Sequence, residues 1–156
     1  MKKIMLIVLL PFVMLGGLAL SPSLVLATLG EPADSVATDS KALAAVQRST
    51  TAYSGYTVKV IQSDANTVRE YIAPSGVVFG IAWNGYVHPD LAKLLGAYAG
   101  GYSQALKQFP VRPGSRRHQV KTGRLVVEKW GHMRNLQGRA YDPSLLPVGV
   151  NSEDIK

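Results

Sequence analysis

Cysteine is absent from this chain of 156 residues, and its absence excludes several kinds of chemistry. No disulfide bond can form, so the fold must be held together by its apolar core. A thiol nucleophile and a cysteine-based metal site are excluded as well. A lipoprotein anchor is also excluded, because it requires a cysteine at the cleavage site.

Histidine is scarce too, and the three histidines match no familiar metal-binding pattern. His88, His118 and His132 fall on three different segments, at spacings unlike His-x-x-x-His. A zinc site that joins them to Asp90 or Glu128 is the alternative to ordinary surface and turn histidines. We expect no metal ion and no other cofactor.

Sequence motifs for nucleophilic catalysis are also missing. The Gly-x-Ser-x-Gly pattern is absent, and Ser75 stands between a proline and a glycine, which suit the positions of a tight turn. Glu70 and Glu128 could form the carboxylate pair of a glycosidase. Both lie in expected strands, where an edge position or a cross-strand partner such as Arg134 or Arg139 is the simpler explanation. The alternative function is that of a small periplasmic hydrolase. It requires at least two of five candidate side chains to converge in one pocket; the candidates are Ser75, His88, His132, Glu70 and Glu128.

The N-terminus carries the pattern of a secretory signal peptide. Residues 1–3 include two lysines, residues 4–20 are mostly apolar, and residues 25–27 match the small-x-small cleavage rule. We expect residues 1–27 to be removed by cleavage after Ala27, which leaves a periplasmic or secreted protein. The alternative is an uncleaved membrane anchor, because the apolar run is longer than a usual signal core.

The rest of the chain divides into a lead, one domain and a tail. Residues 28–52 are mostly small and polar, and we expect a short helix there over residues 40–48. Residues 53–150 have a length that suits a single domain. Residues 151–156 are mostly polar, and we expect them to fray.

Residue patterns in this domain predict a fold of the α+β class. Pro89 and Asp90 favour the start of one main helix, whose apolar stripe would pack on one face of a sheet. Glycines inside this helix, at positions 96, 100 and 101, indicate either close approach to the sheet or a kink. We expect an antiparallel sheet of about five strands in the order β-β-β-α-β-β, over residues 56–61, 67–73, 77–83, 118–130 and 133–141.

Positive charge is concentrated in one segment. The net charge is +7, and residues 107–139 hold nine lysines and arginines against one acid, Glu128. Such an excess favours anionic partners, although a basic face that only keeps the protein soluble is the alternative. Trp83, Tyr86 and Trp130 are candidate aromatic neighbours. The candidate anion-binding residues are Arg112, Arg116, Arg117, Lys121, Arg124, Arg134 and Arg139.

Three blocks of sequence are similar to a known family. They are REYIAPSGVVFGIAWNG (69–85), PDLAKLLGAY (89–98) and LVVEKWGHMRNLQGRAYDPSLLPVGV (125–150). In this order they resemble DUF2844, an exported bacterial family of unknown function, and the likeness extends over residues 56–150. The resemblance implies a signal peptide and an exported single domain. It implies no reaction, ligand or site residue.

These observations favour a binding or accessory module of the cell envelope over an enzyme. We expect its basic face to take an anionic envelope component or another exported protein. Nucleic acid is not an expected partner, because no nucleic-acid-binding signature accompanies the charge. Contact with a membrane is expected only through the signal segment, if it is not cleaved. A homo-oligomeric structural subunit that pairs through a sheet edge is the other alternative.

Overall fold

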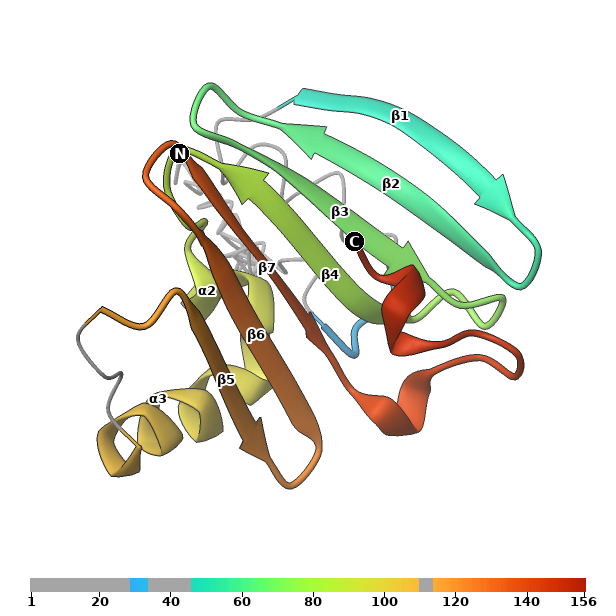
Figure 1. Cartoon of the computed structure of the whole chain (residues 1–156). Helices are drawn as coiled ribbons and strands as arrows, with labels where there is room; N and C mark the ends of the chain where they lie inside the picture. The colour runs from blue at the N-terminus through green and yellow to red at the C-terminus, as the bar shows by residue number, and fades with distance from the viewer. Residues whose placement is uncertain (1–28, 34–45, 110–113) are drawn as a thin grey trace, which may run out of the picture.

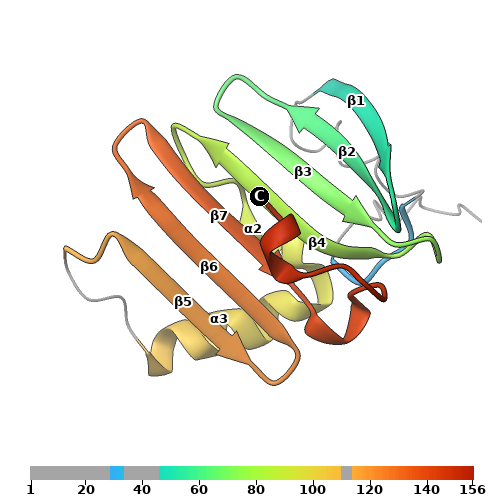
Figure 2. The same ribbon diagram turned by 45° about the vertical axis from the view of Figure 1, so that its right-hand side comes forward.

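One seven-stranded antiparallel sheet forms the centre of the fold (Figure 1). The computed structural model describes residues 29–33, 46–109 and 114–156, so the expected signal peptide lies outside the described residues. The strand order is β1-β2-β3-β4-β7-β6-β5, which Figure 2 shows from one edge to the other. The strands are β1 (Val46–Tyr53), β2 (Tyr56–Gln62), β3 (Asn66–Ile72), β4 (Val78–Gly85), β5 (Arg117–Thr122), β6 (Leu125–His132) and β7 (Asn135–Tyr141).

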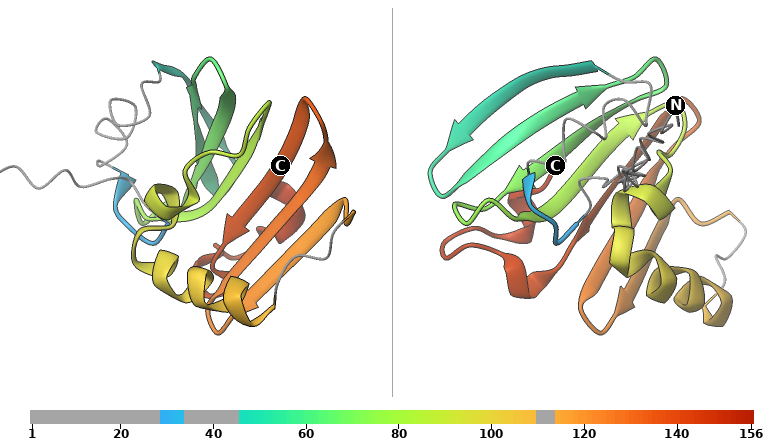
Figure 3. Two further views of the ribbon diagram at one scale, coloured as in Figure 1. Left: turned by 90° about the vertical axis from the view of Figure 1, so that its left-hand side faces the viewer. Right: turned by 180° about the vertical axis from the view of Figure 1, so that it is seen from behind.

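The helices lie on one face of this sheet, toward the edge formed by β5, as the view from behind in Figure 3 shows. They are α2 (Leu91–Leu95), the 3-10 turn η2 (Gly96–Tyr98) and α3 (Ala99–Gln108). The side chain of Asp90 caps α2 by accepting hydrogen bonds from the backbone N–H groups of residues 92 and 93. Gly96 then ends α2 with a φ of 46°, so the chain bends there. The glycines therefore mark a kink, since Gly100 and Gly101 face open space.

Two of the expected element boundaries are wrong. The expected helix over residues 40–48 is not formed at residues 46–48, because they begin β1, which pairs with β2 as an edge strand; residues 40–45 lie outside the described residues. The single strand expected over residues 118–130 is two strands, joined at Gly123 and Arg124 by a two-residue turn. The β1–β2 hairpin and the β5–β6 hairpin each have a glycine in the turn, and glycine is a common signal for a reversal of the chain.

The face of the sheet opposite the helices is partly covered by the C-terminal segment, drawn in red in Figure 1. Residues 151–156, which were expected to fray, are docked onto this face. Ile155 is fully buried and packs where Gly80 has no side chain. The hydroxyl of Tyr71 donates a hydrogen bond to the Lys156 carbonyl over 2.6 Å. The sheet therefore has an apolar cluster on each face, and the second one depends on the tail.

Within the ranges given above, no helix has the length and hydrophobicity of a membrane span. The edge strand β5 carries Arg117 and Lys121 on its exposed positions. Charged side chains on an edge strand discourage pairing with a second sheet.

Replacing Ile155 by alanine is expected to lower the free energy of unfolding by about 2 kcal/mol, because it removes most of a buried side chain from the tail. Val148→Ala is the control, since Val148 is 103% exposed and its loss should have little effect. Urea unfolding followed by circular dichroism measures both variants. Equal stability of the two variants would contradict a docked tail.

Candidate functional site

The candidate anion-binding residues do not form one continuous face. Arg112 lies outside the described residues. Two others already face acids of the chain: the buried Arg139 forms ion pairs with Glu128 and Glu153, and the exposed Arg124 lies 3.4 Å from the buried Asp142 carboxylate. Both arginines therefore have carboxylate partners within the chain, and their expected role as partners for an external anion stays a prediction.

Arg139 is held by the register of the sheet. Residues Glu128 and Arg139 face each other across strands β6 and β7, and Arg139 Nε donates to Glu128 Oε2 over 2.5 Å. Burial alone lowers the pKa of Arg139, but hydrogen bonds to Glu153 and Glu128 outweigh it and raise that pKa above its ordinary value. The expected cross-strand pairing of Glu128 with an arginine is confirmed, and Arg139 is that partner.

Asp142 forms a second structural anchor, at the end of β7. Its buried carboxylate accepts hydrogen bonds from the Ser144 hydroxyl and from the Tyr98 hydroxyl, the latter over 2.7 Å. Burial raises the pKa of Asp142, but these hydrogen bonds and the charge of Arg124 outweigh burial, so the pKa lies below its usual value. The contact between Tyr98 and Asp142 ties the helical layer to the sheet.

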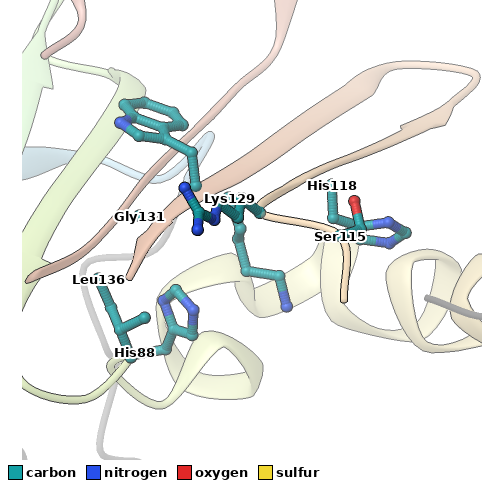
Figure 4. A pocket seen from close by; sticks show the side chains of 8 residues that line it. His88, Ser115, His118, Lys129, Gly131 and Leu136 are labelled. Carbon is teal, nitrogen blue, oxygen red and sulfur yellow. The ribbon is translucent and has the colours of Figure 1, made fainter. Parts of the chain in front are cut away.

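A basic pocket lies at the other end of β6, beside the helical layer (Figure 4). It has a volume of about 190 Å³. Four lining side chains carry or can accept a positive charge, and none of the described lining residues is acidic. We refer to it as the basic pocket; its lining residues are His88, Ser115, Arg116, His118, Lys129, Trp130, Gly131 and Leu136.

The two histidines of this pocket come from different parts of the chain. His88 follows β4, and its Nδ1 accepts a hydrogen bond from Trp83 Nε1 over 2.9 Å. This contact leaves the proton of a neutral His88 on Nε2, so the other ring nitrogen can donate to a ligand. Burial and the charge of Lys129 lower the pKa of His88, which favours the neutral form with one donor.

Lys129 brings a second cationic side chain, beside Arg116, to the same pocket. It faces His118 across strands β5 and β6, and in Figure 4 its side chain extends between His118 and His88. Its Nζ lies 5.7 Å from the centre of the Tyr102 ring, within range of a cation–π interaction. Lys129 was not among the expected site residues, although it is next to Glu128. Alternation along the strand places these neighbours on opposite faces of the sheet.

The remaining candidate residues lie around this end of the sheet or away from it. Arg116 lines the basic pocket, and Arg117, 72% exposed, begins β5 opposite Trp130. Arg134 lies in the β6–β7 turn, with a positive φ of 68°. Lys121 lies near the other end of β5, so it is separate from this group. Of the expected aromatic neighbours, Trp130 lines the pocket, Trp83 is buried behind His88, and Tyr86 is exposed.

The residues of the hydrolase alternative are dispersed. Glu70 is buried on the helix side, in register with Lys59 and Ile81, whereas Glu128 lies on the opposite face of the sheet. Ser75 is exposed in the β3–β4 turn, and His132 is exposed at the β6–β7 turn. Of these five side chains only His88 lines the basic pocket. Across the described parts of the chain, no group of three or more potential ligands is placed to hold a metal ion.

Comparison with known proteins gives a family without an assigned activity. A family model described as a protein of unknown function, DUF2844, matches residues 25–155. Searches of curated proteins and of solved structures found no match. The match includes the basic pocket and the docked tail as far as Ile155. The chain therefore belongs to DUF2844, a family of proteins of unknown function.

Proposed function

We propose that the protein is a non-enzymatic binding module of the cell envelope that takes an anionic partner at the basic pocket. The observation that carries this proposal is the composition of the pocket. Arg116 and Lys129 meet two histidines there, and the described lining residues include no acid. Charges of one sign in a concave site attract the opposite charge, and one further exposed arginine, Arg134, lies in the turn that follows β6.

The chemistry of the pocket suits an oxyanion. A lysine ammonium and an arginine guanidinium are donors only, and a neutral His88 bonded through Nδ1 offers a donor at Nε2. Carboxylate, phosphate and sulfate groups present only acceptor oxygens when ionised, so they match this set. The pocket is large enough for one such group, at about 190 Å³. An acidic polysaccharide or a phosphorylated envelope component would supply many groups of this kind.

We expect the protein to bind a heparin matrix and to elute earlier at higher salt, because exposed charges are screened over about 10 Å at 0.1 M salt. Arg116→Glu should weaken this binding about tenfold, since a contact with a charged group is lost and a repulsion is added. Retention at rising salt concentrations measures the change.

Lys121→Glu is the matched control, because it changes the net charge by the same amount on β5, the strand that Arg116 directly precedes, but away from the pocket. The control should remain close to the natural protein. Equal losses for Arg116→Glu and Lys121→Glu would show a response to net charge only and would contradict a site at the pocket.

A further inference from the structure

A second binding surface lies on the face of the sheet opposite the helices. Three hollows of about 510, 330 and 250 Å³ adjoin one another there, and all three share Lys156. The first and third also share Arg69, and the second and third share Trp130. We propose that this continuous surface, which we name the sheet groove, binds a neutral oligosaccharide.

Tyrosine rings form one end of the sheet groove. Tyr53 and Tyr56 close the β1–β2 hairpin, and their rings stack with centres 5.0 Å apart and an interplanar angle of 14°. Tyr71 follows on β3, with its ring centre 5.9 Å from that of Tyr56. Tyr53 is 54% exposed, so a flat ring is presented to solvent while its neighbours restrict its motion. Such a ring supplies contact area at a low cost in conformational entropy, and the apolar face of a sugar ring can stack on it.

Planar polar side chains continue the groove across the sheet. Arg69 Nη1 donates to Asn84 Oδ1 over 2.7 Å, and Trp130 Nε1 donates to Gln137 Oε1 over 3.1 Å. Asn84 and Gln137 face each other across β4 and β7. These contacts hold the planes in place and leave further donors and acceptors for hydroxyl groups, which both donate and accept. A site that is ordered before binding loses less entropy when the ligand arrives.

The charges of the groove distinguish its ligand from that of the basic pocket. Its largest hollow is lined by charges of both signs, namely Arg69, Lys156 and Asp154. A mixed set of this kind does not select a polyanion, but it can serve the hydroxyl groups of a neutral sugar. An extended peptide would be expected to pair its backbone with an edge strand such as β1. The groove instead lies on the face of the sheet, where it extends from Tyr53 of β1 to Arg117 of β5.

Calorimetric titration with cellohexaose, maltohexaose and chitohexaose tests this proposal. At least one of these probes should bind, and Tyr53→Ala should weaken it about tenfold, the effect of losing about 1.4 kcal/mol of ring contact. Tyr86→Ala is the matched control, because Tyr86 is also exposed (64%) but lies outside the groove. Binding should be unaffected by salt and by Arg116→Glu, which separates this site from the basic pocket.

The proposal is overturned if none of the three sugars binds at concentrations up to about 10 mM, the range of weak specific binding. It is also overturned if Tyr53→Ala binds as tightly as Tyr86→Ala. Tyr53→Phe provides a further check, because it keeps the ring and should retain most of the affinity. Sugar binding that is lost in Arg116→Glu and weakened by salt would assign the ligand to the basic pocket and would contradict a groove site.

Discussion

Gly138→Ala is expected to lower the free energy of unfolding by about 3 kcal/mol or more, at the upper end of the cost of overpacking a core. Gly138 is buried in β7 opposite Trp83. A Cβ atom at this position would overlap Cζ2 of Trp83 and lie 2.7 Å from the Glu128 carbonyl oxygen. That oxygen belongs to β6, which is paired with β5 on one side and with β7 on the other, so a shift of this backbone would disturb the hydrogen bonds between strands.

The Trp83 ring cannot easily move away from such a Cβ. Trp83 is buried in the helix-side cluster, and its Nε1 is bonded to His88. Any shift of the ring would therefore also displace a wall of the basic pocket. We expect Gly138→Ala to weaken binding to heparin as well as stability, because both depend on the position of this ring.

Gly100→Ala is the matched control for this prediction. Gly100 lies in α3, and a Cβ there meets nothing within 4 Å. The same substitution should stabilise the protein by up to about 1 kcal/mol, because alanine favours a helix over glycine. Urea unfolding of both variants measures the contrast. A Gly138→Ala variant as stable as the natural protein would show that Trp83 is free to move.

Much of the sheet could be predicted from local patterns. Alternation predicted β2 and β3, the apolar run predicted the central strand β4, and the Pro-Ser-Gly turn between β3 and β4 is where it was expected. These segments are recognisable because burial on one or both faces imposes a period on the sequence. The kink after α2 was one of two interpretations of its glycines, and the structure decides for it.

The edges and the tail were less predictable, because tertiary contacts decide them. Strand β1 has few large apolar residues and is stabilised by pairing with β2, so its sequence shows no clear period. The tail is mostly polar in sequence, yet its single isoleucine, Ile155, fills the space above Gly80. Neither feature produces a local signal, since each depends on a partner that is distant in the sequence.

The charged residues of the candidate site were also only partly predictable from the sequence. The excess of lysine and arginine was visible, but the sequence does not say which charges are already paired. Arg139 and Arg124 meet buried carboxylates, whereas Arg116 and Lys129 reach a pocket without an acid among its described residues. The register of β5, β6 and β7 makes this division. With that register known, the expected site would have included Lys129 and would not have included Arg139.

Arg139→Met is expected to lower the free energy of unfolding by about 3–5 kcal/mol, the usual cost of removing one partner from a buried ion pair. Glu128 is only 4% exposed and would lose its main partner, and the Ser152 carbonyl of the docked tail would lose a hydrogen bond of 2.6 Å. Methionine keeps much of the apolar length of arginine. The loss should therefore come from charge and hydrogen bonds, and not from a cavity.

Arg117→Met is the matched control, because Arg117 contacts the same carboxylate over 3.8 Å but is largely exposed. An exposed pair contributes about 0–1 kcal/mol, so this variant should be close to the natural protein. The double variant Glu128→Gln with Arg139→Met should recover part of the stability lost in Arg139→Met, because a neutral amide replaces the stranded charge. Equal losses in Arg139→Met and Arg117→Met would show that burial does not set the strength of this pair. A double variant less stable than Arg139→Met alone would instead assign the loss to the contacts between Arg139 and the tail.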